Sequence, residues 1–195
     1  MRQSRPARTF WWDRERPVEA DILRAVIFDA DSALADIERD GDVAPRAGLI
    51  DLIMSLFVAG IWVGVVSTGR RERVEPTVRQ LVGDGLVETL VTADDVAPPE
   101  PERQAESGAE LYRLALWELG IAPAGALAIG GSGRSLRAAI TAGLPSLVVT
   151  ADYSADFTGA AAVRLGYDGA DPLLADGCQQ QHRRWSIQQM RSRTA

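Results

Sequence analysis

The chain alternates short runs of β-branched and other apolar residues with longer segments whose apolar side chains recur at helical spacing. The short runs predict five strands and a weaker sixth, at residues 25–28, 62–66, 89–92, 127–129, 147–150 and 162–165. The longer segments predict helices at residues 47–59, 71–82, 106–119, 135–142 and 178–190. This alternation favours an α/β fold, a doubly wound parallel sheet with helices on both faces.

Composition excludes several kinds of chemistry. All 21 basic residues are arginine, so Schiff-base catalysis and a P-loop lysine are ruled out. The single cysteine, Cys178, excludes an intrachain disulfide, and we expect a reducing, cytoplasmic setting. The single histidine, His182, excludes a zinc site with several histidines. The most apolar stretch, residues 52–66, is shorter than the ~20 residues of a membrane span, so no membrane contact is expected.

Charge divides the 195-residue chain into three parts. Between residues 13 and 176 the acidic residues outnumber the arginines by 13, whereas the two ends carry arginines and no acid. We therefore predict an N-terminal arm (1–22), a core domain (23–176) and a C-terminal helix with a basic tail (177–195). The acidic core is expected to repel nucleic acid.

Two carboxylates follow the first predicted strand. Asp29 and Asp31 are separated by one residue, and ligands of parallel sheets bind beyond the carboxyl ends of the strands. Residues 67–69 and 130–132 are expected at the same edge. The first carboxylate is suited to attack a phosphorus atom and the second to handle the proton of the leaving group. An anionic nucleophile would need a divalent cation to approach a phosphate.

Residues 26–36 resemble motif I of the haloacid dehalogenase (HAD) superfamily, whose usual form is Asp-x-Asp-Gly-Thr after an apolar strand. Ser67, after the second strand, looks like the motif II hydroxyl. The resemblance implies Asp29 as nucleophile, Asp31 as acid/base, magnesium held by both aspartates, and Ser67 with Thr68 as phosphate ligands.

Further similar segments follow in the family's order between residues 25 and 163, and they are closest to the branch of sugar-phosphate phosphatases and β-phosphoglucomutase. The interval of residues 36–45 is too short for the helical cap that this branch inserts there. We therefore expect a capless, Rossmann-like HAD core with an open site.

The chain departs from the family at the residues that carry charge. Ser32 and Ala33 replace the Gly-Thr of motif I. The motif III loop, residues 98–101, reads Pro-Pro-Glu-Pro and lacks the usual lysine, with Arg103 as the nearest cation in sequence. The motif IV position holds Gly130 and Gly131 in place of acids. These changes weaken magnesium binding and the charge stabilisation on which phosphoryl transfer relies.

The glycine-rich loop at motif IV has two interpretations. Its backbone N–H groups, at Gly131 and Ser132, and the side chain of Arg134 suit a phosphate group at the start of a helix. Alternatively, the loop is a flexible turn that remained after the acids were lost.

Two hypotheses of different class remain. In the first, the chain is a non-catalytic HAD-like module that binds a protein partner or a second copy through its open face and termini, including residues 10–12 (Phe-Trp-Trp). In the second, it is an active capless phosphatase with Asp29 as nucleophile. Either would be compatible with a phosphate-containing small molecule as ligand.

Overall fold

The computed structural model describes residues 22–37, 43–97, 107–151 and 155–193. Its centre is a six-stranded sheet in the order β5-β4-β1-β6-β7-β8, and every neighbouring pair is parallel. The strands are β1 (Ala25–Asp29), β4 (Trp62–Val66), β5 (Thr89–Val91), β6 (Ala126–Gly130), β7 (Ser146–Val149) and β8 (Ala162–Arg164). The predicted strands, including the weak sixth, and the doubly wound α/β class are confirmed.

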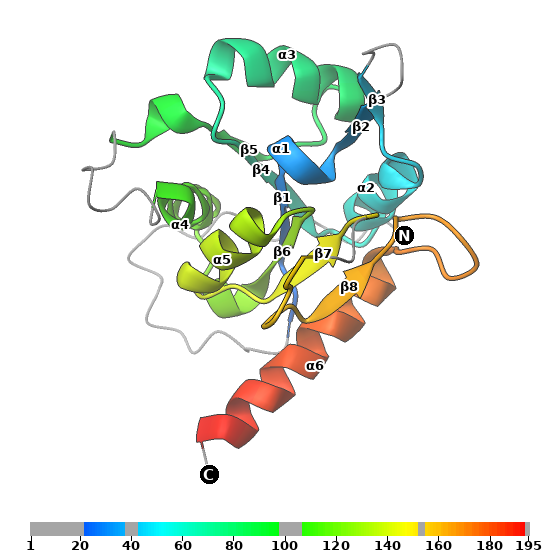
Figure 1. Ribbon diagram of the computed structural model, residues 1–195, viewed down its shortest axis with the longest axis vertical. Helices are drawn as coiled ribbons and strands as arrows, with labels where there is room; N and C mark the ends of the chain where they lie inside the picture. The colour runs from blue at the N-terminus through cyan, green and yellow to red at the C-terminus, as the bar shows by residue number, and fades with distance from the viewer. Residues whose placement is uncertain (1–21, 38–42, 98–106, 152–154, 194–195) are drawn as a thin grey trace.

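Helices cover both faces of the sheet (Figure 1). They are α1 (Ala30–Ala33), α2 (Leu49–Val58), α3 (Arg71–Val82), α4 (Ser107–Leu119), α5 (Gly133–Thr141) and α6 (Ala175–Arg193). Apolar side chains of α2, α3 and α6 form one core with the sheet, and those of α4 and α5 form a second core on the opposite face. Five of these helices agree with the sequence prediction to within a few residues at each end.

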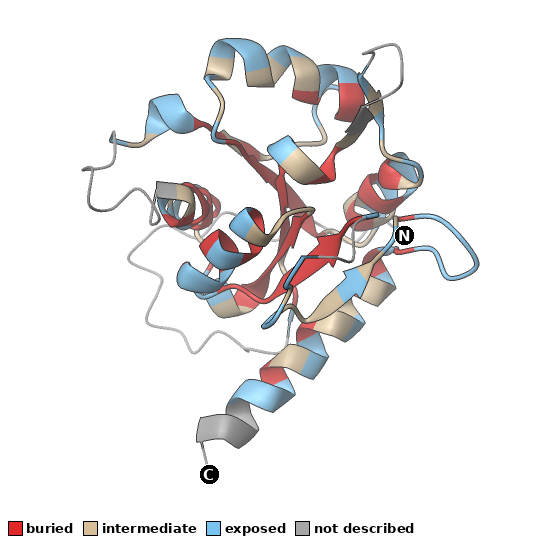
Figure 2. Ribbon diagram, viewed as in Figure 1, coloured by how far each residue is buried: buried red, intermediate tan, exposed pale blue. Residues whose placement is uncertain are grey.

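Both faces of the central strand β1 are buried, which explains why the strands appear in the sequence as continuous apolar runs. Val26 and Phe28 point into the core beneath α2 and α3, whereas Ala25 and Ile27 point into the core beneath α4 and α5. All five residues of β1 are buried, and Figure 2 shows the sheet as the buried centre of the molecule. Burying such a side chain contributes about 1.5–3 kcal/mol to stability, so both faces of the sheet select apolar residues.

Helix α6 packs along the sheet through one face. Cys178 and His182, four residues apart on that face, are both fully buried, and His182 Nε2 lies 2.7 Å from the carbonyl oxygen of Ala124. Burial raises the pKa of the Cys178 thiol to about 12. Among the described residues, no helix combines the length and the apolar character needed to cross a membrane.

A short hairpin separates β1 from α2. Its antiparallel strands are β2 (Ala35–Ile37) and β3 (Val43–Pro45), and neither was predicted because three residues are too few to show an alternating pattern. Residues 38–42 lie outside the described residues, so the absence of a cap stays a prediction. The predicted motif III loop, Arg103 and the aromatic residues 10–12 also lie outside the described ranges.

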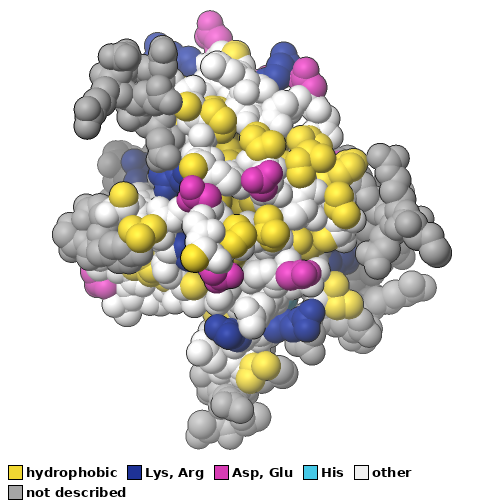
Figure 3. All heavy atoms as spheres, turned by 90° about the vertical axis from the view of Figure 1, so that its right-hand side faces the viewer, with side chains coloured by type: hydrophobic (Ala, Val, Ile, Leu, Met, Phe, Trp, Pro, Cys, Tyr) yellow, Lys and Arg dark blue, Asp and Glu magenta, His cyan; other side chains and the backbone are white. Residues whose placement is uncertain are grey.

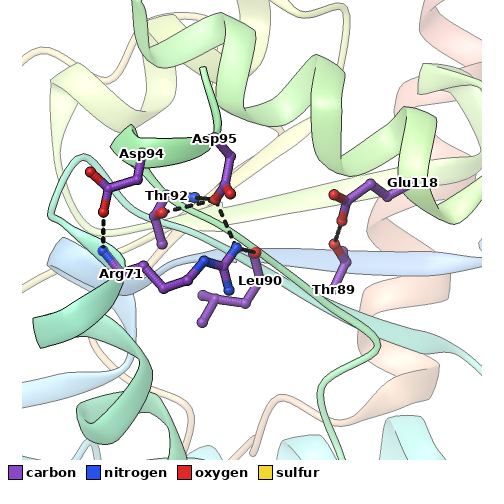
Figure 4. Close-up of polar contacts among 7 residues, drawn as sticks. All are labelled: Arg71, Thr89, Leu90, Thr92, Asp94, Asp95 and Glu118. Carbon is purple, nitrogen blue, oxygen red and sulfur yellow. Dashed lines mark hydrogen bonds and ion pairs between the residues drawn. The ribbon is translucent and has the colours of Figure 1, made fainter. Parts of the chain in front are cut away.

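A polar network joins the end of β5 to the start of α3 (Figure 4). The backbone N–H of Arg71 donates to Asp94 Oδ2 at 2.8 Å, and the Arg71 guanidinium donates to Leu90 O and Asp95 Oδ2, both at 2.8 Å. Burial opposes the charge of Asp95, but bonds from Thr92 and Arg71 outweigh it and lower the pKa of that carboxyl. The network holds the short turn between β4 and α3.

That turn begins with two of the predicted site residues, Ser67 and Thr68. It is also fixed by backbone bonds to the end of β5 and the residues that follow it: Ser67 N–H donates to Val91 O at 2.9 Å, and Ala93 N–H donates to Gly69 O at 3.1 Å. The Arg71 network and these backbone hydrogen bonds therefore both fix the turn in place.

Candidate functional site

The carboxyl ends of β1, β4 and β6 meet around a pocket of about 190 Å³. Because neighbouring parallel strands end at one edge of the sheet, residues far apart in sequence converge there. The residues lining the pocket are Asp29, Asp31, Ser32, Val66, Thr68, Gly108, Leu111, Tyr112, Ser132, Arg134, Ser135 and Ala138. Five of the predicted site residues are among them, whereas Ser67 and Gly131 are not.

Asp29 is the last residue of β1 and is only 8% exposed. Its burial raises the pKa of the carboxyl to about 6, and the nearby charge of Asp31 acts in the same direction. Hydrogen bonds to the carboxyl, above all the one from Ser32, oppose this shift without cancelling it. Asp29 therefore titrates close to neutral pH, which is typical of a carboxylate in a functional site.

Asp31 is held by the turn after β4. Ser67 Oγ donates to Asp31 Oδ1 at 2.5 Å, while Thr68 donates to Asp31 Oδ2 from its backbone N–H at 2.8 Å and its hydroxyl at 2.7 Å. Ser67 is fully buried and also accepts the Gly69 N–H at 3.0 Å. The hydroxyl predicted to bind phosphate is therefore turned toward Asp31.

Ser32 connects Asp29 to the loop after β6. Its hydroxyl donates to Asp29 Oδ2 and accepts the backbone N–H of Gly131 at 2.8 Å. Residue 32 belongs to α1, whereas Gly131 lies 99 residues further along the chain. One short side chain thus joins the predicted nucleophile to the motif IV loop.

The backbone around this loop leaves little room for side chains at the two glycines. A Cβ atom at Gly130 would lie 2.2 Å from Ser135 Oγ, and one at Gly131 would lie 2.1 Å from the carbonyl oxygen of Ser32. Both distances are shorter than real Cβ atoms tolerate. The acidic residues that the family resemblance implies here would require α1 or the start of α5 to move.

Arg46 links α1 to β7 through its guanidinium group. Its Nη1 donates to Val149 O at 2.7 Å and its Nη2 to Ser32 O at 3.3 Å. These are the two carbonyl oxygens that a Cβ at Gly131 would approach. This role of Arg46 was not predicted, because its partners lie in α1 and β7 and nothing in the local sequence around residue 46 signals the contact.

The loop that begins α5 satisfies much of its own hydrogen bonding. Ser132 and Ser135 cap the helix reciprocally, with Ser135 N–H donating to Ser132 Oγ at 3.1 Å and Ser132 N–H donating to Ser135 Oγ at 3.2 Å. The Gly131 N–H is bound by Ser32. The backbone amides of Gly131, Ser132 and Ser135 are therefore already hydrogen-bonded within the protein. Among the residues that line the pocket, the cation is the guanidinium of Arg134.

The described residues do not fit the magnesium site that the resemblance implies. Among them, no group of three or more Asp, Glu, His or Cys side chains lies close enough together to hold a metal ion. Magnesium prefers oxygen ligands in a near-octahedral shell anchored by carboxylates. Here both oxygens of Asp31 accept hydrogen bonds, and Ser32 donates to one oxygen of Asp29.

A family model described as haloacid dehalogenase-like hydrolase matches residues 31–149. The chain belongs to this family. The predicted HAD core is thereby confirmed, and the six-stranded parallel sheet with Asp29 at the end of its central strand agrees with it.

Two relatives of known name share part of the HAD core. Protein CbbY from Cereibacter sphaeroides is 34% identical over 126 residues, which are 62% of this chain and 52% of the relative. A CBBY-like protein from Arabidopsis thaliana is 31% identical over 112 residues, which are 57% of this chain and 34% of the relative. The chain thus spans about half or less of the length of the curated relatives it matches.

Solved HAD structures share the fold at low sequence identity. CbbY from Rhodobacter sphaeroides in complex with phosphate matches with a TM-score of 0.67 and 22% identity, over 80% of this chain and 99% of that one. The β-phosphoglucomutase of Clostridium difficile matches with a TM-score of 0.67 and 12% identity, over 85% of this chain and 100% of that one. The predicted closeness to this branch is therefore confirmed for the fold.

The raised pKa of Asp29 leads to a prediction about stability. The Asp29 carboxyl binds its proton more tightly in the native state than in the unfolded chain, so the protonated carboxyl stabilises the native state. This contribution to the free energy of unfolding is complete below about pH 4 and is lost as the pH rises through about 6. Asp29→Asn removes the cost of a buried charge. We expect the variant to be more stable than the wild type by about 3 kcal/mol near pH 8, with the difference disappearing toward pH 4.

Urea denaturation at several pH values measures this difference. A variant that is less stable than the wild type at high pH would show that the Asp29 carboxylate is stabilised by its surroundings, contrary to the geometry.

The close approach at Gly131 leads to a second prediction. Gly131→Ala places a methyl group against the carbonyl oxygens of Ser32 and Val149, at 2.1 and 3.0 Å, and is expected to cost about 2 kcal/mol of unfolding free energy. Gly133→Ala is the matched control because its nearest neighbour is the flexible end of Arg137, at 3.4 Å. Equal stability of the two variants in urea would contradict the crowding at residue 131.

Proposed function

We propose that this protein is a HAD-family module that binds a small phosphorylated ligand in the pocket beside Asp29 and hydrolyses phosphate esters slowly or not at all. Two observations support it. The pocket lies at the carboxyl ends of the strands and is lined by Asp29, Asp31 and Arg134. The chain lacks the lysine and the motif IV acids whose charges phosphoryl transfer needs. The predicted pseudoenzyme character and the phosphate-containing ligand are both parts of this proposal.

The contact of Ser32 with Asp29 and Gly131 carries the proposal. It occupies one oxygen of the carboxylate that would attack phosphorus, and it draws α1 toward the loop where a third carboxylate would have to stand. Phosphoryl transfer depends largely on positioning and on charge stabilisation. With the motif IV acids replaced and the lysine absent from the chain, little of that stabilisation remains.

The ligand class follows from the pocket and from the relatives. Arg134 lies among the lining residues in the first turn of α5, where its guanidinium favours an anion. One similar solved structure, CbbY from Rhodobacter sphaeroides, is in complex with phosphate, and a mutant of the same protein is in complex with xylulose-(1,5)bisphosphate. A phosphorylated sugar is therefore the ligand class that we propose for this chain.

The alternative hypothesis, an active phosphatase, is favoured by one arrangement. Asp29 and Asp31 both line the pocket, and Asp29 has a pKa of about 6, so it is mostly ionised at neutral pH and remains available as a nucleophile. In that case Asp29 attacks the phosphorus and Asp31 transfers the proton of the leaving group.

Hydrolysis of an aryl phosphate with magnesium present distinguishes the two hypotheses. We expect the wild type and Asp29→Asn to show the same background rate, about 10³-fold or more below that of a HAD phosphatase with complete motifs, because several stabilising charges are missing. Isothermal titration with inorganic phosphate should nevertheless detect binding to both proteins. Magnesium-dependent turnover that Asp29→Asn abolishes would establish the alternative.

We further propose that the protein associates with a second copy of itself. Three large apolar side chains of α2, Ile50, Met54 and Val58, are 42%, 43% and 74% exposed. Their spacing of four residues forms a stripe along the helix, and Figure 3 shows apolar side chains gathered on one face of the molecule. A ridge of this spacing can pack against its own copy about a twofold axis.

Light scattering coupled to size exclusion tests this association. We expect a dimer for the full chain, and Val58→Asp, which places a charge in the stripe, should weaken the dimer at least about tenfold. Gln80→Asp is the matched control, since it adds the same charge to an exposed position of α3. A wild type that stays monomeric at high concentration would refute the proposal.

A further inference from the structure

Tyr112 is a buried tyrosine whose hydroxyl has no hydrogen-bond partner among the residues that the structure describes. It belongs to α4, is 2% exposed and packs in the same core as Leu111 and Ala115. Phenylalanine would fill this space without a polar oxygen. Because an unpaired buried hydroxyl loses its contacts with water and gains none in return, packing alone does not account for a tyrosine here.

The position of Tyr112 provides a second, independent observation. Its side chain lines the pocket that also contains Asp29 and Asp31. Burial holds the pKa of the phenol well above its ordinary value, and the charges of the two carboxylates raise it further. The phenol is therefore neutral and keeps its proton, yet no hydrogen bond joins it to either carboxylate.

The other hydroxyl groups of the pocket already donate their protons within the protein. Ser32 donates to Asp29, Thr68 to Asp31, Ser132 to the Ser135 hydroxyl, and Ser135 to the carbonyl oxygen of Ser132. Among the lining hydroxyls, the proton of Tyr112 is the one not used in this way. Tyr112 is therefore the lining residue that still has a neutral hydrogen-bond donor to offer a ligand.

We propose that the Tyr112 hydroxyl donates a hydrogen bond to a phosphoryl oxygen of the ligand bound beside Asp29. This inference rests on the proposed function and deepens it, because it names the residue that recognises the oxyanion. The hydroxyl oxygen exposes almost no surface, so the proposed bond requires the side chains around it to shift when the ligand binds. Once formed, the bond is shielded from competing water.

The experiment compares the wild type with Tyr112→Phe, a substitution that removes the hydroxyl and keeps the ring. Isothermal titration with inorganic phosphate is expected to show binding about tenfold weaker for the variant, the size typical of a hydrogen bond to a charged group. The melting temperature of the ligand-free variant should equal or exceed that of the wild type, since no bond is lost. The rise in melting temperature on adding phosphate should be smaller.

Tyr167→Phe is the matched control. Tyr167 is also a fully buried tyrosine, but its hydroxyl donates to Ala33 O at 2.8 Å. Its ring packs edge-on against that of Phe28, with the two ring centroids 6.4 Å apart. We expect this variant to melt at a lower temperature while its phosphate affinity stays unchanged. The two tyrosines thus separate a role in binding from a role in folding.

Three other results of these measurements would contradict the role of Tyr112, the proposed function, or both. If the wild type binds phosphate and Tyr112→Phe binds it equally well, the role of Tyr112 is refuted and the proposed function stands. If Tyr112→Phe melts lower or folds poorly, the hydroxyl has a structural partner and the inference is refuted. If the wild type binds no phosphate, both the proposed function and the role of Tyr112 are refuted.

Discussion

The hydroxyl of Ser32 joins the two halves of the site. By donating to Asp29 and accepting from the Gly131 amide, it links the end of the central strand β1 to the loop after the neighbouring strand β6. Glycine at positions 130 and 131 allows this close approach, because larger residues would clash with Ser135 and with the Ser32 carbonyl.

The site is consequently built from hydroxyls and amides more than from charges. Asp31 is surrounded by donors from Ser67 and Thr68, whereas Asp29 is buried deeply enough for its pKa to reach about 6. Of the arginines at this edge, Arg46 binds two carbonyl oxygens, whereas Arg134 lines the pocket from an exposed position. This shortage of charge is the basis of our proposal that the site binds a ligand and is poor at stabilising a highly charged transition state.

The sequence predicted the framework because the framework depends on local patterns. Apolar runs located all six strands of the main sheet, and Asp29 and Asp31 at the end of the first run located two residues that line the pocket. The contact between Ser32 and Gly131 joins residues 99 positions apart, and no local pattern reports it. Tyr112 was hidden for a related reason, since a tyrosine on the buried stripe of a helix resembles any other core aromatic residue.

The packing of α6 has a practical consequence. Cys178 is the only thiol of the chain, is fully buried, and has a pKa of about 12. Since the thiolate is the reactive form, alkylating reagents reach this sulfur only when the last helix lifts from the sheet. The unmodified protein thus carries its own chemical reporter of local opening, read by mass spectrometry from a single labelled position.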